Sequence, residues 1–448
     1  MKTLIRNIGL LAGISDAPRK CGAAMEKVEC LRNAWLLLDG DRIVDFGGEA
    51  VEGAPPEGRN TRGSIAGGPP QSGGGVSPKG ELPRGDAPSA VDREIDAGGG
   101  MVLPAFCDSH THIVWAGSRE AEFEDKIRGL SYAEIAARGG GILNSADLLH
   151  ATSEDELYQQ SLERVCEMMA KGTGAIEIKS GYGLSTEDEL KMLRVIRRIS
   201  ETVPAVVRAT FLGAHAVPRD MTREDYVHKV CSEMIPAVAA EGLADFADVF
   251  CEEGFFTVED TARILEAGAK YGLRPKLHAN QLHVSGGVQV GVAHGALSVD
   301  HLERTTDAEI ACLLGTPTMP TMLPGASFFL REPYGNAAGF IREGLGVALA
   351  SDYNPGSSPS GDMRFVMALG CIQMRLTPEQ AFNAVTLNGA YAMGLSSAQA
   401  SAPAVGSIAR GRLANLIVSR PGFDTLGSIA YLYQTPFISK VILKGREL

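Results

Sequence analysis

The sequence predicts an α/β protein: a (β/α)8 TIM-like barrel with a small β-domain built from both chain termini. Two observations predict the barrel. From residue 101 short apolar strands alternate with helical segments, and about eight alternations within about 250–300 residues are typical of a parallel barrel. Strand-like stretches near both ends predict the β-domain. We therefore assign 101–402 to a barrel and 1–100 with 403–448 to the β-domain.

The N-terminal part begins with short apolar or alternating stretches over 2–12 and 33–47, which favour β-strands separated by turns. Over 53–100 the composition changes to Gly, Pro and Ser. Such a stretch buries too little apolar surface to offset the entropy of its backbone. We expect a flexible loop or insertion there, without a chemical role.

The barrel elements follow in order along the chain. The expected strands lie at 101–108, 174–180, 205–213, 246–251, 274–279, 296–301, 316–322 and 346–352. The expected helices include 153–171, 187–201, 223–240, 257–271, 306–314, 335–344, 362–373 and 378–394. The helix at 257–271 has a start like a capping box and apolar residues at helical spacing. After the barrel, the stretches 414–418, 429–431 and 439–444 again favour short strands.

Composition restricts the partners and the compartment. The net charge of −12, from 54 acidic and 42 basic residues, argues against nucleic-acid and anionic-membrane partners, which favour basic patches. No apolar run approaches the roughly 20 residues of a membrane span. Eight scattered cysteines without a Cys-x-x-Cys pair favour reduced thiols in the cytoplasm. Homo-oligomers are common among large cytosolic proteins, so a homodimer is one expectation.

Polar side chains gather where the expected strands end. His110 and His112 follow the first strand, and residues separated by one position in a strand point the same way. Other strand ends carry His215, His278, His301 and Asp352, so five of the nine histidines share this placement. In such barrels the carboxyl ends of the strands carry the reactive groups. We expect one site there.

Three imidazoles and a carboxylate, from His110, His112, His278 and Asp352, match a divalent metal of the zinc or iron type with an open position for water. The expected chemistry is hydrolysis by a metal-bound hydroxide. Taken singly, His278 also fits a buried structural histidine, and Asp352 a helix cap. Lys179 at the end of the second strand could bridge a second metal if carbamylated, but nothing else indicates one.

The surrounding residues suggest further roles. Asp352 could accept the proton of the water, and His301 could support or relay it. Arg119 is suited to clamp a substrate carboxylate, although a surface arginine fits equally well. Tyr182 could donate a hydrogen bond, or simply pack in a turn. The stretch with Asn354, Gly356 and Ser357 could offer amide groups to a second anionic end, or be a plain turn.

Several of these stretches resemble a known family. Pro104-Ala105-Phe106-Cys107-Asp108-Ser109-His110-Thr111-His112 is similar to the metal-binding opening of the amidohydrolase superfamily. The longer set resembles the imidazolonepropionase family over roughly 101–395: Gly117-Ser118-Arg119-Glu120, Gly139-Gly140-Gly141-Ile142-Leu143, Lys179-Ser180-Gly181-Tyr182-Gly183-Leu184, Thr210-Phe211-Leu212-Gly213-Ala214-His215-Ala216-Val217-Pro218 and Ser351-Asp352-Tyr353-Asn354-Pro355-Gly356-Ser357.

The resemblance implies a cyclic-amide hydrolase that opens the ring of 4-imidazolone-5-propanoate to N-formimidoyl-L-glutamate in histidine degradation. It implies one zinc or iron per subunit, held by His110, His112, His278 and Asp352. It further implies that substrate contacts come from Arg119, Tyr182, His215 and Asn354, with His301 near the reacting water.

The sequence departs from the family pattern in three places. An acid/base and substrate-contact position that is usually glutamate is Gln281 here, and an amide cannot shuttle a proton at neutral pH. The stretch 144–150 lacks the usual arginines, and 53–100 is longer than the usual connection. Two alternatives stay open: another superfamily enzyme, such as a deaminase or cyclic amidase, and a non-catalytic ligand-binding barrel.

Overall fold

Two sheets organise the chain in the computed structural model, which describes residues 1–51, 88, 90–130, 134, 140–397 and 403–448. Most of the Gly- and Pro-rich stretch expected to be flexible therefore lies outside the described residues. All eight cysteines lie within these ranges and are unpaired. Across the same ranges, no helix combines the length and the apolar character needed to cross a membrane.

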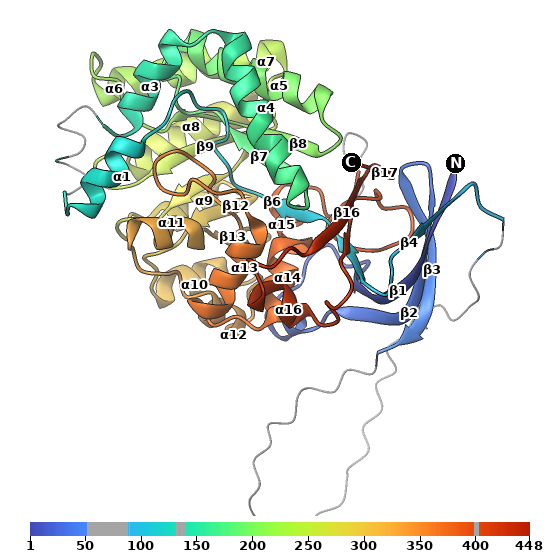
Figure 1. The fold of residues 1–448 in the computed structure, drawn as a ribbon. Coiled ribbons are helices and arrows are strands. Elements are labelled where there is room, and N and C mark those ends of the chain that lie inside the picture. Colours follow the sequence, from blue (N-terminus) through green and yellow to red (C-terminus); the bar gives the residue numbers. More distant parts are fainter. Residues whose placement is uncertain (52–87, 89, 131–133, 135–139, 398–402) are drawn as a thin grey trace, which may run out of the picture.

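The larger sheet curls into a nearly closed parallel barrel (Figure 1). Its strands are, in hydrogen-bonded order, β6 (Phe106–Asp108), β7 (Thr173–Lys179), β8 (Val206–Ala214), β9 (Phe246–Cys251), β11 (Leu277–Ala279), β12 (Ser298–His301), β13 (Met319–Met322) and β14 (Ala348–Leu349), with β10 (Arg274–Pro275) beside β9. Beyond the ends of β6 and β14, a parallel bridge between Thr111 and Tyr353 joins the first and last strands. The predicted barrel is confirmed.

Helices surround the barrel on its outside (Figure 1). They are α1 (Glu120–Ile127), α3 (Ile142–Ala151), α4 (Glu154–Ala170), α5 (Thr186–Thr202), α6 (Arg223–Lys229), α7 (Ile235–Glu241), α8 (Val258–Lys270), α9 (Gly287–Ala293), α10 (Asp307–Leu313), α11 (Pro324–Leu330), α12 (Ala337–Arg342), α13 (Met363–Ile372), α14 (Pro378–Val385) and α15 (Leu387–Ala392). A π-helical segment, η2 (Val230–Met234), joins α6 to α7. At α8 the Thr257 and Asp260 side chains form the predicted capping box.

The second sheet is built from both ends of the chain, as predicted, and the two termini lie on the same side of the molecule (Figure 1). Its strands are β1 (Lys2–Ile14), β2 (Glu29–Asp39), β3 (Arg42–Ala50), β4 (Arg93–Asp96), β5 (Met101–Pro104), β15 (Leu416–Ser419), β16 (Ile438–Leu443) and β17 (Arg446–Glu447), and a short helix, η1 (Gly22–Glu26), follows β1. Ile5, Leu36, Val102 and Leu416 pack in one apolar core.

The strand expected at 101–108 is in fact two strands in different sheets. Pro104 ends β5 opposite Leu416 in the terminal sheet, whereas Phe106 begins β6 and pairs with Thr173 in the barrel. The chain thus crosses from one sheet to the other at Ala105. A continuous apolar run cannot reveal this crossing, because both sheets bury the strand that they receive.

The prediction of a strand at 429–431 is wrong. These residues belong to a helix, α16 (Leu426–Tyr431), which the Thr425 side chain caps by accepting from Ser428 N–H. The Arg364 guanidinium donates to the carbonyls of Ile429 and Leu432 near its C-terminal end. Short apolar runs fit helix and strand equally well. The helix expected at 378–394 is also interrupted, because Thr386 leaves helical geometry between α14 and α15.

Candidate metal centre and substrate pocket

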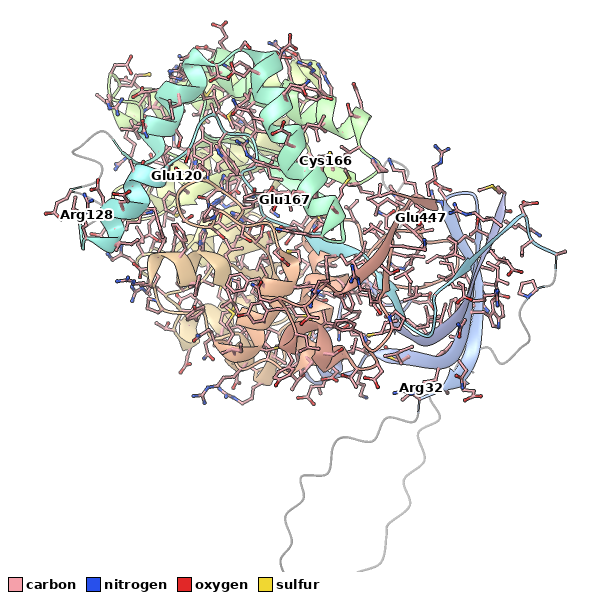
Figure 2. The ribbon with its side chains drawn as sticks, in the orientation of Figure 1. Arg32, Glu120, Arg128, Cys166, Glu167 and Glu447 are labelled. Carbon is pink, nitrogen blue, oxygen red and sulfur yellow. The ribbon has the colours of Figure 1, made fainter. Side chains whose placement is uncertain are left out.

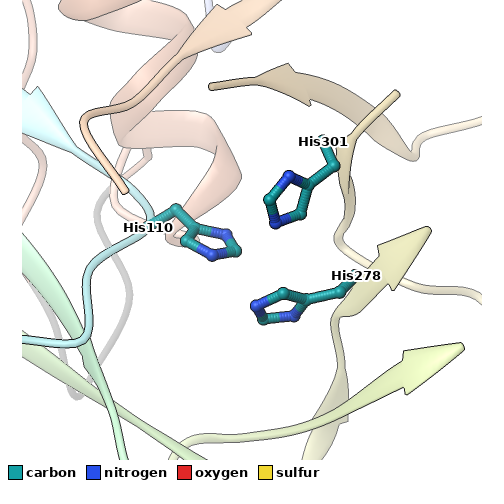
Figure 3. Close-up of side chains that lie close together, drawn as sticks. All are labelled: His110, His278 and His301. Atoms are coloured by element: carbon teal, nitrogen blue, oxygen red, sulfur yellow. The ribbon is translucent and has the colours of Figure 1, made fainter. Parts of the chain in front are cut away.

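The four side chains predicted to hold a metal meet at the carboxyl end of the barrel. His110 Nε2 and His278 Nε2 each lie 3.3 Å from His112 Nε2. Asp352 Oδ1 lies 3.6 Å from His110 Nε2 and 3.5 Å from His112 Nε2. Figure 3 shows His110 and His278 pointing toward each other, with His301 beside them.

These distances fit a tetrahedral metal. Ligand atoms about 2.0–2.1 Å from such an ion lie about 3.3–3.4 Å from one another. Burial also holds the pKa of His110 and His112 well below the ordinary value and lowers that of His278 to about 3. The imidazoles are therefore neutral, which is the form that binds metals. The donor set suits a divalent cation.

Two buried carboxylates orient the histidine ligands. Asp300 Oδ2 lies 2.7 Å from His110 Nδ1, and Asp248 Oδ2 lies 3.0 Å from His278 Nδ1. Asp248 Oδ1 also accepts from the His278 backbone N–H at 3.1 Å. Such partners fix which nitrogen of an imidazole faces the metal. The Nε2 atoms of both rings thereby face the shared centre.

Two lysines balance these carboxylates beneath the site. Lys179 Nζ donates to Glu177 Oε1 and Asp248 Oδ2, both at 2.8 Å, and lies 3.9 Å from Asp300 Oδ2. Lys276 Nζ donates to the Ser109 carbonyl at 2.9 Å and lies 3.8 Å from Asp300 Oδ2. All five side chains are fully buried. We call them the charge network.

The charge network favours an ammonium at Lys179. Burial alone would lower its pKa, but Asp248, Glu177 and Asp300 together raise it above the ordinary value. A carbamylated, metal-bridging lysine would have to give up these ion pairs. The arrangement therefore supports a single-metal site.

Sequence reasoning missed the network. The signal that could have revealed it is a charged residue inside an apolar strand, two positions before a polar residue at the strand end. Lys276 stands in this relation to His278, so both side chains point to the same face of the strand. Glu177 and Lys179 are spaced in the same way on β7.

His301 lies beside the four ligands and has its own carboxylate partner. Its Nδ1 is 3.2 Å from Glu303 Oε1. Burial opposes protonation, but Glu303 raises the pKa of His301 above the ordinary value. One nitrogen each from His301, His110 and His278 also lies within 4.8 Å of the other two. The ring is therefore close enough to serve a reaction at the metal centre.

The backbone is strained where the site is assembled. Asn280, His301 and Asp352 all have positive φ, at 56°, 85° and 53°. Left-handed geometry costs a non-glycine residue about 1–3 kcal/mol and concentrates at functional sites. The three strained residues follow or end β11, β12 and β14, where strands turn into loops around the candidate centre.

A cavity of about 860 Å³ opens beside the candidate metal ligands. Its walls include every predicted substrate-contact residue: Arg119, Tyr182, His215, Gln281, Asn354, Gly356 and Ser357. The His112, His278, His301 and Asp352 side chains line it as well. The remaining histidines, His150, His228, His283 and His294, are not among its lining residues.

Arg119 precedes α1, and Glu122 fixes its orientation. The Arg119 Nε and Nη2 groups donate to the two oxygens of Glu122 at 2.9 and 2.5 Å. Glu122 Oε1 also accepts from Gly141 N–H at 3.0 Å. Both side chains are at least nine-tenths buried. This fork-to-fork contact holds the guanidinium plane at the cavity wall.

Tyr182 and His215 form the wall nearest His112. The His215 ring stacks on His112 with centroids 5.2 Å apart, and the Tyr182 ring lies 5.4 Å from His215. His215 Nδ1 donates to the Gly181 carbonyl at 2.9 Å, so Nε2 is an acceptor in the neutral ring. Burial lowers the pKa of His215 to about 4. Glu189 accepts from Gly181, Gly183 and Leu184 N–H groups and holds this loop.

The amides after Asp352 are used within their own loop. Gly356 N–H and Ser357 N–H both donate to Asn354 Oδ1 at 2.8 Å. Asn354 Nδ2 donates to the Asp352 carbonyl and to Ser357 Oγ. The expectation that these amides receive an anionic end does not fit this geometry, because an Asx-type turn already satisfies them. Ser357 Oγ instead donates to Asp352 Oδ2 at 3.2 Å.

Comparison with known proteins shows which family the chain resembles. A sequence model of the amidohydrolase family matches residues 101–448. The chain is 46% identical to an imidazolonepropionase of Flavobacterium johnsoniae over 100% of both chains. It is 41% identical to an imidazolonepropionase of Pseudomonas putida over 83% of this chain and 91% of that protein.

Solved structures show the same fold at low identity. A triazine hydrolase variant superposes with a TM-score of 0.69 at 15% identity, covering 100% of this chain and 94% of that one. An adenosine deaminase from Xanthomonas campestris with bound zinc gives 0.66 at 14% identity, covering 99% and 92%. The chain belongs to the amidohydrolase family.

Proposed function

We propose that this chain hydrolyses the ring amide of 4-imidazolone-5-propanoate to N-formimidoyl-L-glutamate. One observation carries the proposal: a single cavity is lined by candidate metal ligands and also by Arg119. The ring amide would react at the ligands while the propionate meets the cation. Identity of 41–46% to imidazolonepropionases over most or all of the chain supports the same substrate.

We further propose that His110, His112, His278 and Asp352 hold one zinc or iron ion per chain. A divalent cation there would lower the pKa of a bound water toward about 7 and so supply a nucleophile at neutral pH. A homodimer remains a prediction.

Ring opening adds water across a C–N bond, so a proton must travel from the water to the departing ring nitrogen. Asp352 would accept this proton, and His301, paired with Glu303, would relay it to the departing ring nitrogen. Gln281 lines the cavity, but its amide can only hydrogen-bond. Arg119, Tyr182 and His215 would orient the substrate, whereas Asn354 would shape the loop at the cavity wall through its hydrogen bonds to Gly356 and Ser357.

The alternatives have less support. A deaminase or another cyclic amidase would share the metal ligands but would not require the Arg119 clamp. A non-catalytic barrel would not require His301 and Glu303 beside an ionisable ligand such as Asp352.

Turnover tests the proposal directly. Purified protein loaded with zinc or iron should remove the ultraviolet absorbance of imidazolone propanoate and release N-formimidoyl-L-glutamate. Protein that holds metal but shows no turnover would contradict the proposal and favour the non-catalytic alternative.

Replacing Gly356 by alanine should raise KM for this substrate about tenfold or more, with a smaller effect on kcat. A Cβ at Gly356 would lie 2.1 Å from Arg119 Nη1. Because the guanidinium is hydrogen-bonded to Glu122, Arg119 cannot move away from the added methyl group without breaking these bonds and changing its orientation. Steady-state kinetics measure the change. Gly427→Ala, where a Cβ meets nothing closer than 3.7 Å, is the control and should leave KM unaltered.

Gln281→Glu should retain activity, because the proton route already runs through Asp352 and His301. The pH profile of kcat/KM measures the outcome. Collapse of activity in this variant would show that the amide has a role that a carboxylate cannot fill.

A further inference from the structure

We propose that Lys126 is a second substrate-binding cation, which contacts the propionate carboxylate beside Arg119 and selects anionic substrates. This inference rests on the proposed function, and it names the group that distinguishes acids from neutral analogues at that site. Lys126 lies in the last turn of α1, and its side chain lines the same cavity as Arg119.

Both cations converge on one backbone position. Lys126 Nζ donates to the Gly356 carbonyl at 2.5 Å. On the same glycine, a Cβ would collide with the Arg119 guanidinium. The ammonium and the guanidinium therefore flank Gly356, in the loop that follows the metal ligand Asp352. A carboxylate near Gly356 would be within reach of both.

The charge balance at this end of the cavity gives Lys126 its role. The Arg119 charge is matched by Glu122, since their side chains form a buried bidentate pair. Among the residues that the structure describes, no carboxylate lies within 4.0 Å of Lys126 Nζ. Its hydrogen-bond partner is a neutral carbonyl, which occupies one of its three N–H donors. The two cations and the single Glu122 carboxylate therefore leave one net positive charge, which we assign to Lys126.

The surroundings strengthen the electrostatic effect. Lys126 Nζ lies 5.5 Å from the centroid of the Phe329 ring, which stacks with Phe123 at 5.3 Å. Burial and then the Arg119 charge lower the pKa of Lys126 to about 8, although the Glu122 carboxylate opposes them. The Lys126 side chain is still mostly protonated at neutral pH, and it lies close enough to Arg119 for the two charges to interact. A partly buried cation of this kind binds an anion more strongly than an exposed one does.

The test compares an acid with its uncharged amide. Calorimetry would measure binding of imidazole-4-propanoate and of imidazole-4-propanamide to the metal-loaded protein. We expect Lys126→Met to weaken binding of the acid about tenfold or more, and to leave binding of the amide unaltered. Lys126→Arg should restore most of the preference. With the substrate, Lys126→Met should raise KM by a similar factor while kcat changes less than about twofold.

Arg128→Met is the matched control. Arg128 follows the same helix, its side chain is 68% exposed, and Figure 2 shows it at the outer edge of the molecule. An acid-to-amide preference that Lys126→Met leaves intact, or that the wild type lacks, would overturn the role of Lys126. Wild-type protein that prefers the acid yet turns over no imidazolone propanoate would instead contradict the proposed function.

Discussion

Replacing Lys179 by methionine should destabilise the protein by about 3–5 kcal/mol, because it removes one partner from a fully buried set of ion pairs. Glu177 and Asp248 would lose their 2.8 Å contacts with the ammonium. Lys276, 4.0 Å from Glu177 and 3.8 Å from Asp300, would be the remaining cation of the charge network. Methionine fills a similar volume, so the loss would report charge rather than packing.

Urea denaturation would measure this effect through the transition midpoint and its slope. Lys171→Met is the control, because Lys171 forms an exposed pair with Glu167 and should shift stability by less than about 0.5 kcal/mol. Metal titration against a chelator gives a second readout. Loss of the Asp248 partner should loosen His278 and weaken metal affinity about 10–100-fold. Unchanged stability in Lys179→Met would contradict a structural role for the network.

The second large effect is expected at Asp352. Asp352→Asn should lower kcat about 10²–10⁴-fold, because the amide oxygen can still bind a metal but cannot accept a proton. The substitution suits the backbone: φ at this position is 53°, and asparagine adopts left-handed geometry readily. Folding should therefore be preserved.

Kinetics at measured metal content would test this expectation. Asp147→Asn removes the same charge from an exposed pair with Arg219 and should leave kcat unaltered. An Asp352→Asn variant that binds a full equivalent of metal and keeps kcat within about twofold would show that the proton leaves by another route.

The sequence predicted the barrel and the grouping of the candidate metal ligands because both follow from periodic signals. Strand ends converge in a parallel barrel, so His110, His278 and Asp352 could be grouped without knowing their distances. The crossing at Ala105 and the helix at 426–431 could not be predicted in this way, because short apolar runs do not identify the sheet or the element that buries them.

The contacts that support the candidate ligands could not be predicted from the sequence. The pairing of Asp300 with His110 joins positions 190 residues apart, and no local pattern reports such a contact. The same holds for the Asn354 turn, where the amides of Gly356 and Ser357 point back to their own loop. Lys126 was missed because an isolated lysine on a charged helix gives no signal of its own.

A crystal structure of zinc-loaded protein with anomalous data at the zinc edge would test the central claim. We expect one anomalous peak per chain, about 2.0–2.2 Å from the three histidine Nε2 atoms and the Asp352 carboxylate. A zinc peak coordinated by other side chains would contradict the proposed metal centre. So would protein with full zinc content but no peak beside these four residues.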